Sequence, residues 1–257
     1  MQLLVLDLEG KMAHFRKYFA NNTAMSYSLP PRTTVMGMLA AIMGLPRDGY
    51  YGLLGSARLQ LGLRIVNPVK KSFHRLNYLK VESSSQFTGS NGRIQVPVEI
   101  VTGRHPRHSQ LCYRLYVAAG TSSQGGESFE QLHQHLRNKG GHYPVSFGAA
   151  PFAARLKQWQ LAQASSMPTP AAPVLMHSAV PTQYIKQVAL PAAEAFRQIE
   201  EELLPADFMV DGTRKLQHMN RLLYATDGQP LPLALNSPYW QVQYPTIPDT
   251  EHISFMA

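Results

Sequence analysis

The chain has 257 residues, of which 44% are hydrophobic, and its formal net charge is +8. This size is enough to bury a core in one large domain or two small ones. The longest apolar stretch, Val35 to Leu45, is too short to cross a bilayer, and the single cysteine, Cys112, cannot form an internal disulfide. We therefore expect a cytoplasmic protein that has no signal peptide and does not bind a membrane.

The positive charge is concentrated in the first half of the sequence. Residues 11–110 hold fourteen Lys and Arg against three acids, whereas residues 111–257 hold ten against eleven. Such segregation favours a polyanionic partner, either nucleic acid or an anionic membrane. Because the cations lie among predicted turns and strands and form no clean amphipathic helix, the pattern favours nucleic acid. An ordinary basic surface is the alternative.

The first predicted elements are a strand and a helix. Residues 2–8 have the pattern of a buried strand, and a polar, aromatic stretch follows at 10–32. Pro30-Pro31 ends that stretch. Thr33 is then placed to cap an apolar helix from Thr34 to Met43, which Gly44 closes.

A second strand and a long hairpin follow. Alternating apolar residues predict a strand over 57–66, with one covered face. The turn-rich insertion at 67–108 is predicted to form a hairpin, with Gly89-Ser90-Asn91-Gly92 as its turn. Its outgoing arm alternates apolar and polar residues, and Pro97 marks that arm as an edge strand.

The next predicted elements complete the first domain. A third strand is predicted over 111–118, a helix from a capping box at Ser128 through Asn138, and a fourth strand over 143–147. The order β-α-β, hairpin, β-α-β predicts an α+β, ferredoxin-like (RRM-like) domain. We place this domain at 1–162, a connector at 163–173, and a small β-rich C-terminal lobe at 174–257.

The start of the first helix is a predicted anion site. Free backbone N–H groups and the helix dipole favour a phosphate there, and Arg32, Thr33 and Thr34 add donors. Upstream, residues 14–19 mix cations with rings, a combination that binds single-stranded RNA through phosphate contacts and base stacking. Alternatively, these rings fill the core and the threonines only cap the helix.

Several motifs in this region resemble a known family. They are Gly10 with Ala13-His14-Phe15-Arg16, then Ser26-Tyr27-Ser28-Leu29-Pro30-Pro31-Arg32-Thr33-Thr34, Gly37-Met38-Leu39-Ala40-Ala41, Gly44-Leu45-Pro46-Arg47-Asp48 and, later, Tyr143-Pro144-Val145-Ser146-Phe147-Gly148. Together they resemble the fifth family of CRISPR-associated (Cas) proteins, the RAMP-superfamily subunits of type I Cascade complexes, with I-B as the suggested subtype.

The resemblance implies a RAMP domain with an inserted β-hairpin thumb. It also implies binding of the 5′ handle of crRNA, together with contacts to the Cascade backbone subunit and large subunit. Contact with target DNA near the PAM is left open. The expected RNA contacts are Arg16, Lys17, Tyr27, Arg32, Thr33, Thr34, Arg47, Lys71, His74, Arg75 and Arg104.

Catalysis is the second functional hypothesis. One branch of the family cleaves precursor crRNA without metal, using Tyr, His and Lys, and His14, Lys17 and His74 are available here. No spacing singles out a catalytic set, so we expect a non-catalytic subunit, with a metal-independent endoribonuclease as the alternative. A third reading is an RNA-binding module unrelated to CRISPR. His133 and His135 would face different directions on a helix, and we expect no metal site and no cofactor.

Overall fold

The computed structural model describes residues 1–20, 23–105, 110–139, 141–191, 197–211, 213–245 and 249–256. The end of the predicted hairpin insertion, 106–108, lies outside these residues. No helix in the described ranges is long and apolar enough to span a bilayer.

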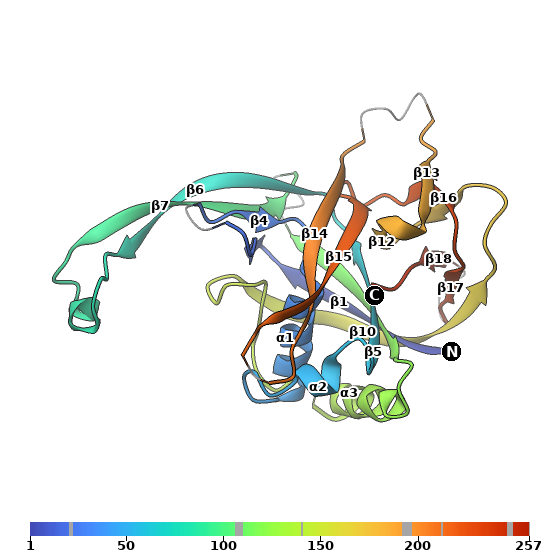
Figure 1. Ribbon diagram of the computed structural model, residues 1–257, viewed down its shortest axis with the longest axis horizontal. Coiled ribbons are helices and arrows are strands. Elements are labelled where there is room, and N and C mark those ends of the chain that lie inside the picture. Colours follow the sequence, from blue (N-terminus) through green and yellow to red (C-terminus); the bar gives the residue numbers. More distant parts are fainter. Residues whose placement is uncertain are drawn as a thin grey trace.

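One antiparallel sheet forms the centre of the molecule (Figure 1). Its middle strand, β1 (Gln2–Gly10), lies between β10 (Ala153–Met167) and β8 (Leu111–Ala119), and β8 pairs in turn with β5 (Leu59–Ile65). Helix α1 (Arg32–Met43) lies between β1 and β5 in the chain, and α3 (Gly125–Lys139) lies between β8 and β10. This order is the split βαβ arrangement that the sequence predicts. The predicted α+β class is confirmed.

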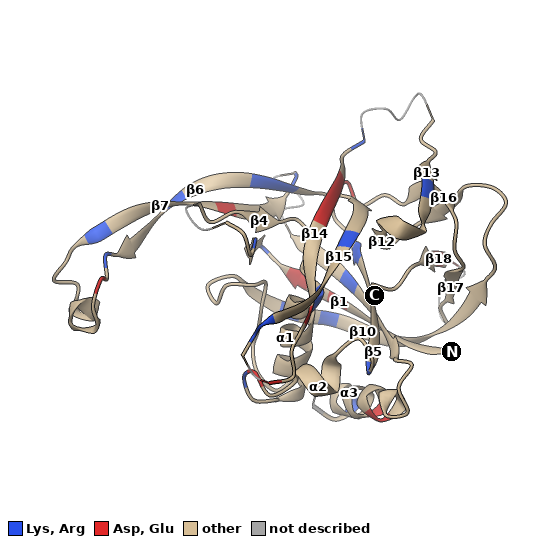
Figure 2. Ribbon diagram, viewed as in Figure 1, with Lys and Arg blue, Asp and Glu red and all other residues tan. Residues whose placement is uncertain are grey.

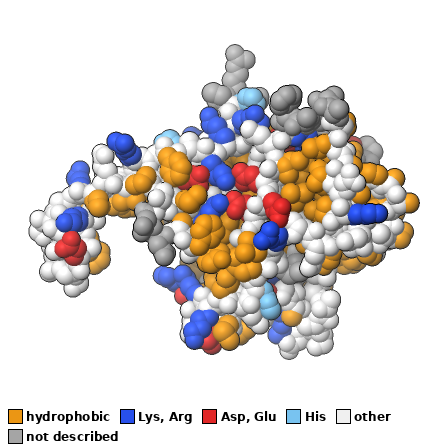
Figure 3. All heavy atoms as spheres, turned by 45° about the horizontal axis from the view of Figure 1, so that its top comes forward, with side chains coloured by type: hydrophobic (Ala, Val, Ile, Leu, Met, Phe, Trp, Pro, Cys, Tyr) orange, Lys and Arg blue, Asp and Glu red, His pale blue; other side chains and the backbone are white. Residues whose placement is uncertain are grey.

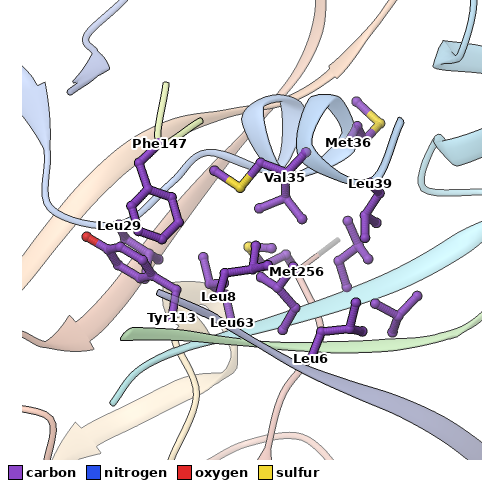
Figure 4. Packing of buried hydrophobic residues seen from close by; sticks show 14 of the residues in the cluster. Leu6, Leu8, Leu29, Val35, Met36, Leu39, Leu63, Tyr113, Phe147 and Met256 are labelled. Atoms are coloured by element: carbon purple, nitrogen blue, oxygen red, sulfur yellow. The ribbon is translucent and has the colours of Figure 1, made fainter. Parts of the chain in front are cut away.

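The main core lies between this sheet and α1 (Figure 4). Leu6 and Leu8 of β1 and Leu63 of β5 face Val35, Met36 and Leu39 of the helix, and all six side chains are buried. Alternate residues of each strand point to one face, so a single helix packs against both β1 and β5. The core therefore fixes where the two ends of α1 lie.

Helix α1 begins earlier in the chain than the sequence predicts. Pro31 is the N-cap, Arg32 is the first helical residue, and no side chain caps the helix start. The predicted cap at Thr33 is therefore wrong, because Thr33 already lies inside the first turn. The predicted end is confirmed, since Gly44 adopts a left-handed φ of 72° and its N–H bonds the carbonyls of the last turn.

Helix α3 also begins earlier than the sequence suggests, at Gly125 instead of Ser128. Ser128 lies within the first turn, and its buried hydroxyl has no hydrogen-bond partner in the described part of the chain. The predicted capping box is therefore absent.

A long hairpin projects from the sheet on the left of Figure 1. Strands β6 (Val69–Leu79) and β7 (Arg93–Gly103) pair over their full length, from Val69 with Gly103 to Leu79 with Arg93. The predicted hairpin is confirmed, but its connection is longer than the expected four-residue turn and contains a 3-10 helix, η1 (Ser84–Thr88). Near its base β7 also pairs with β2 (Met12–Ala13), so the edge-strand assignment holds only for the outer part of β7.

The C-terminal third partly joins the central sheet. Strands β17 (Tyr239–Gln243) and β18 (Thr250–Ile253) extend it beyond β10. Residues 163–167, predicted as the start of a connector, instead form the end of β10 and pair with β17. The predicted fourth strand at 143–147 shrinks to β9 (Val145–Ser146), and β10 takes its place in the sheet.

Two small sheets complete the molecule. One contains β11 (Val174–Met176), β16 (Leu231–Leu235) and β13 (Ile185–Val188), with η2 (Thr182–Tyr184) before β13. The other contains β12 (Val180–Pro181), β15 (Leu216–Ala225) and β14 (Ile199–Phe208). The long β14–β15 pair runs past the start of α1 (Figure 1), where two short strands, β3 (Phe15–Arg16) and β4 (Ser26–Tyr27), and the one-turn α2 (Tyr51–Leu54) also lie.

Candidate nucleic-acid interface

A groove crosses the start of α1. Its larger part is a cavity of about 850 Å³ between β3, the helix start, the hairpin β6–β7 and the β14–β15 pair. A second hollow of about 360 Å³ continues it toward Tyr50 and Tyr51. The two parts share Thr33, Thr34, Gly148, Phe208 and Arg214, and so form one groove.

The floor of the groove favours an anion. The first turn of α1 contains no acidic residue, and no side chain bonds its free N–H groups. Thr33 is only 8% exposed and lines the groove, yet within the described residues neither its hydroxyl nor that of Thr34 has a protein hydrogen-bond partner. A phosphate seated here would meet backbone donors, the positive end of the helix dipole and two hydroxyls.

The wall opposite the helix start depends on a glycine. Gly148 has a φ of 85°, and a Cβ at this position would lie 2.0 Å from the carbonyl oxygen of His14. Only glycine allows the two backbone segments to approach this closely. The close approach of residues 14 and 148 therefore shapes the groove.

Two arginines bring positive charge to the groove. Arg16 lines the groove and is exposed, and its Nη2 makes one long hydrogen bond within the described residues, of 3.4 Å to the carbonyl of Ala20. Arg214 lies between β14 and β15, and its Nε donates to Asp48 over 2.6 Å. Tyr51 also donates to Asp48, and these two hydrogen bonds lower the pKa of that carboxyl. Arg214 is thus held in place at the groove with nearly half of its side chain exposed.

Sequence reasoning missed Arg214. The residue lies 166 positions beyond its partner Asp48, in a stretch that no motif singled out. The backbone offers a signal only once the structure is known, because Asp48 and Arg214 both adopt a positive φ, of 62° and 53°.

Arg32 differs from its expected role. Its side chain is 1% exposed and pairs with Asp207 over 2.5 Å. A second terminal nitrogen donates to the carbonyls of Leu54 and Leu59. Burial lowers the pKa of the guanidinium, and the charge of Asp207 opposes that shift. Arg32 therefore joins α1 to β14 inside the protein. Its Nε has no hydrogen-bond partner among the described residues, but it is buried and Arg32 does not line the groove.

Lys17 and Lys71 are likewise paired internally. Lys17 bonds Glu202 of β14 over 2.6 Å, and Lys71 lies 3.2 Å from Glu200 and 3.7 Å from Glu202. Figure 2 shows this acidic strand beside the basic base of the hairpin. The carboxylates of the C-terminal half thus neutralise part of the positive charge of the N-terminal half.

The aromatic residues divide into two groups. Tyr27 and Phe15 are buried, and the Tyr27 hydroxyl donates to the carbonyl of Leu203, so neither ring is open for stacking. Tyr18 and Tyr78 both line the groove and are 54% and 48% exposed. The core-filling alternative therefore describes Tyr27 and Phe15, and the rings accessible to a base are others.

The remaining predicted contacts lie on the surface around the groove. His74, Arg75 and Arg104 are exposed, and Arg47 makes only a 3.4 Å contact with Asp48. His74 and Tyr78 share one face of β6, whereas Arg75 points to the other face. Figure 3 shows cationic side chains scattered along the hairpin among apolar ones. The structure thus brings Arg16, Thr33 and Thr34 together and leaves these four outside the groove itself.

The sequence model of the family described as "CRISPR-associated protein (Cas_Cas5)" matches residues 3–154. The match covers more than half of the chain and includes β3, α1 and Gly148. The chain belongs to this family, Cas5. No curated protein sequence matches it.

Solved structures are similar to this Cas5 protein at low sequence identity. A crystal structure of a CRISPR protein from Archaeoglobus fulgidus superposes with a TM-score of 0.56 and 11% identity, covering 100% of both chains. A chain of a CRISPR RNA-guided surveillance complex has a TM-score of 0.46 and 12% identity over 91% of both chains. The first of these likenesses agrees with the strand-rich α+β fold.

One histidine lies at the groove of this Cas5 protein. His14 is 7% exposed, lines the groove, and its Nδ1 lies 2.8 Å from the carbonyl oxygen of Glu99. A carbonyl accepts hydrogen bonds only, so Nδ1 carries a proton, and in the neutral imidazole Nε2 is the nitrogen with the lone pair. No group of three or more potential metal ligands occurs among the residues that the structure describes.

Proposed function

We propose that this Cas5 protein is a non-catalytic subunit of a crRNA-guided type I surveillance complex. In this proposal it binds and caps the 5′ handle of crRNA in the groove over α1. The observation that carries the proposal is the helix start at the groove floor, where Thr33 is nearly buried and its hydroxyl is without a partner in the described chain. The type I assignment and the I-B subtype rest on the motif resemblance alone.

The proposed contact set follows the geometry. Thr33, Thr34, Arg16 and Arg214 hold phosphates, and Tyr18 and Tyr78 stack on bases. Arg47, His74, Arg75 and Arg104 are exposed and add long-range attraction for the RNA backbone. Lys17, Tyr27, Arg32 and Lys71 support the groove from within.

The hairpin and the C-terminal third have proposed roles as well. We assign β6–β7 as the thumb that contacts the neighbouring backbone subunit, because exposed apolar side chains such as Phe73, Leu79 and Phe87 lie along it. The residues after 174 form the proposed C-terminal lobe, and the large subunit and the DNA near the PAM are its candidate partners.

A binding experiment tests the groove. Replacing Arg16 with Ala removes a charged donor, so we expect handle RNA to bind roughly 10- to 100-fold more weakly, from about 1.5–3 kcal/mol for such a hydrogen bond. Arg137→Ala on α3 removes an equal charge from the exposed side of that helix and serves as the matched control. Equal affinities of the wild type and Arg16→Ala, at matched salt, contradict the proposal.

A metal-independent endoribonuclease is the second candidate, and the free Nε2 of His14 at the groove favours it. The test incubates the purified protein with repeat RNA in EDTA. We expect the RNA to remain intact. Cleavage that disappears in His14→Ala would replace the non-catalytic assignment with this one.

A further inference from the structure

The groove does not end at the start of α1. A third hollow of about 380 Å³ follows the outer face of the helix and shares Gly37, Ala41 and Tyr50 with the second. It ends at Pro46, Arg47 and Tyr143. At about 1.5 Å per residue, the path from Thr34 to Leu45 is roughly 16 Å long. We call the three connected hollows the α1 track.

The floor of the α1 track is smooth and its sides carry rings. Gly37, Ala40 and Ala41 give the helix a low surface, because none has a side chain longer than a methyl group. Tyr50 lies where the second and third hollows meet, and Tyr143, at the far end, is 53% exposed. The N–H groups of His142 and Tyr143 donate to the carbonyls of Ile42 and Ala41, both over 2.9 Å. These bonds fix the Tyr143 backbone beside the helix end.

The charge along the track has one sign. Among the described residues that line the three hollows there is no Asp or Glu, whereas Arg16, Arg214 and Arg47 occur in order along it. Asp48, just outside the lining, is paired with both Arg214 and Arg47. A path with arginines, rings and no carboxylate is complementary to single-stranded nucleic acid.

We propose that the RNA strand seated at Thr33 continues along the α1 track to Tyr143 and Arg47. Its backbone follows Arg214 and Arg47, and its bases stack on Tyr50 and Tyr143. This inference rests on the proposed function and extends the binding site into the third hollow, whose Arg47 and Tyr143 lie outside the groove at the helix start. Thr33, a residue only 8% exposed whose hydroxyl has no partner among the described residues, marks where the strand enters the track.

The test blocks the track one helical turn beyond the helix start, at Gly37 in the second hollow, and separately at Tyr143 in the third. A leucine at position 37 projects into the hollow, because an added Cβ already lies 3.2 Å from the Tyr50 hydroxyl. Gly126→Leu on the exposed first turn of α3 is the matched control, since a Cβ there meets nothing within 4 Å. Tyr143→Ala, at an exposed position, removes a stacking ring and needs no repacking.

The readout is affinity for handle oligonucleotides shortened one nucleotide at a time, at fixed salt, with thermal unfolding to verify folding. We expect the affinity of the wild type and Gly126→Leu to rise with length and then level off. Gly37→Leu and Tyr143→Ala level off at a shorter length, roughly 5- to 100-fold below the wild type for the longest oligonucleotide, the scale of one lost stacked base.

The outcomes separate the two proposals. If all four proteins level off at the same length and affinity, the α1 track does not hold RNA, while the proposed function stands. If Arg16→Ala also leaves the affinity unchanged, the proposed function fails with it. If Gly37→Leu binds RNA normally but no longer assembles with its partner subunits, a protein segment occupies the track and the inference is overturned.

Discussion

Arg32 and Asp207 form a buried ion pair whose members lie 175 residues apart. Replacing Asp207 with Asn leaves the Arg32 charge without its partner in a buried site. We expect the free energy of unfolding to fall by about 3–5 kcal/mol, the usual cost of breaking such a pair. Urea denaturation measures this free energy. The exposed Asp211→Asn is the control, and its free energy of unfolding should lie within about 0.5 kcal/mol of the wild-type value. A loss for Asp207→Asn as small as that of the control would contradict the pair's structural role.

His177 makes stability depend on pH. Burial, with the charge of Arg64, lowers its pKa from 6.5 to about 4, and the N–H of His252 donates to its Nδ1 over 3.0 Å. Between these two pH values His177 binds a proton in the unfolded chain but stays neutral in the folded protein. The free energy of unfolding therefore falls as pH drops from about 6.5 toward 4. In His177→Gln, denaturation midpoints should vary less with pH over this range. If the wild type and His177→Gln show the same pH dependence, His177 does not cause it.

At the residue scale, the sequence predicted where the candidate groove lies better than it predicted which side chains are exposed. The helix start at Thr33 and Thr34 lies at a groove, as local motifs indicated. The carboxylates that pair with Arg32 and Lys17 lie 175 and 185 residues away. Local patterns cannot reveal such partners, and so could not separate these two cations from the exposed Arg16.

At the scale of elements, the C-cap of α1 and the first turn of α3 give a matched pair of glycines. Gly44 has a positive φ, and an added Cβ would lie 2.6 Å from Cγ of His142. Gly44→Ala should therefore lower the free energy of unfolding by more than about 1 kcal/mol. Gly126→Ala, at an open helical position, should raise it by up to about 1 kcal/mol. Thermal unfolding of both variants tests this prediction. Melting temperatures that both rise or both fall relative to the wild type would contradict it.

Strand β10 shows why one element escaped prediction. Its fifteen residues include no Val, Ile or Thr and are rich in Ala, Gln and Leu, a composition that favours a helix. The strand exists because it pairs with β1 along its length and with β17 at its end. Tertiary pairing overrides local propensity here. The other strands of the split βαβ sheet carry β-branched or alternating apolar residues, and those were predicted.

At the scale of the whole molecule, the charge asymmetry of the sequence is reduced by folding. The acids of β14 lie against Lys17, Lys71 and Arg32, and Figure 3 shows a group of acidic side chains with cations around it. Along the α1 track the positive charge is that of Arg16, Arg214 and Arg47, the last two of which also contact Asp48.

This count predicts the salt dependence of binding. Three phosphate contacts to single-stranded RNA give a slope of about −2 for log affinity against log salt, since each contributes about 0.7. Each of Arg16→Ala, Arg214→Ala and Arg47→Ala should flatten the slope by about 0.7, and Arg137→Ala should leave it unchanged. Titrations at several salt concentrations measure it. A slope near −10 would show that many more cations contact the RNA.

The pairing of β14 with distant cations also limits how Cas5 sequences can be recombined. Glu202 and Asp207 reach back to Lys17 and Arg32, and Arg214 to Asp48. A chimera whose last third lacks the counterparts of Glu202, Asp207 and Arg214 would leave Lys17, Arg32 and Asp48 without these partners. An exchange that keeps both members of each pair avoids this cost, so the two parts of the chain have to be chosen together.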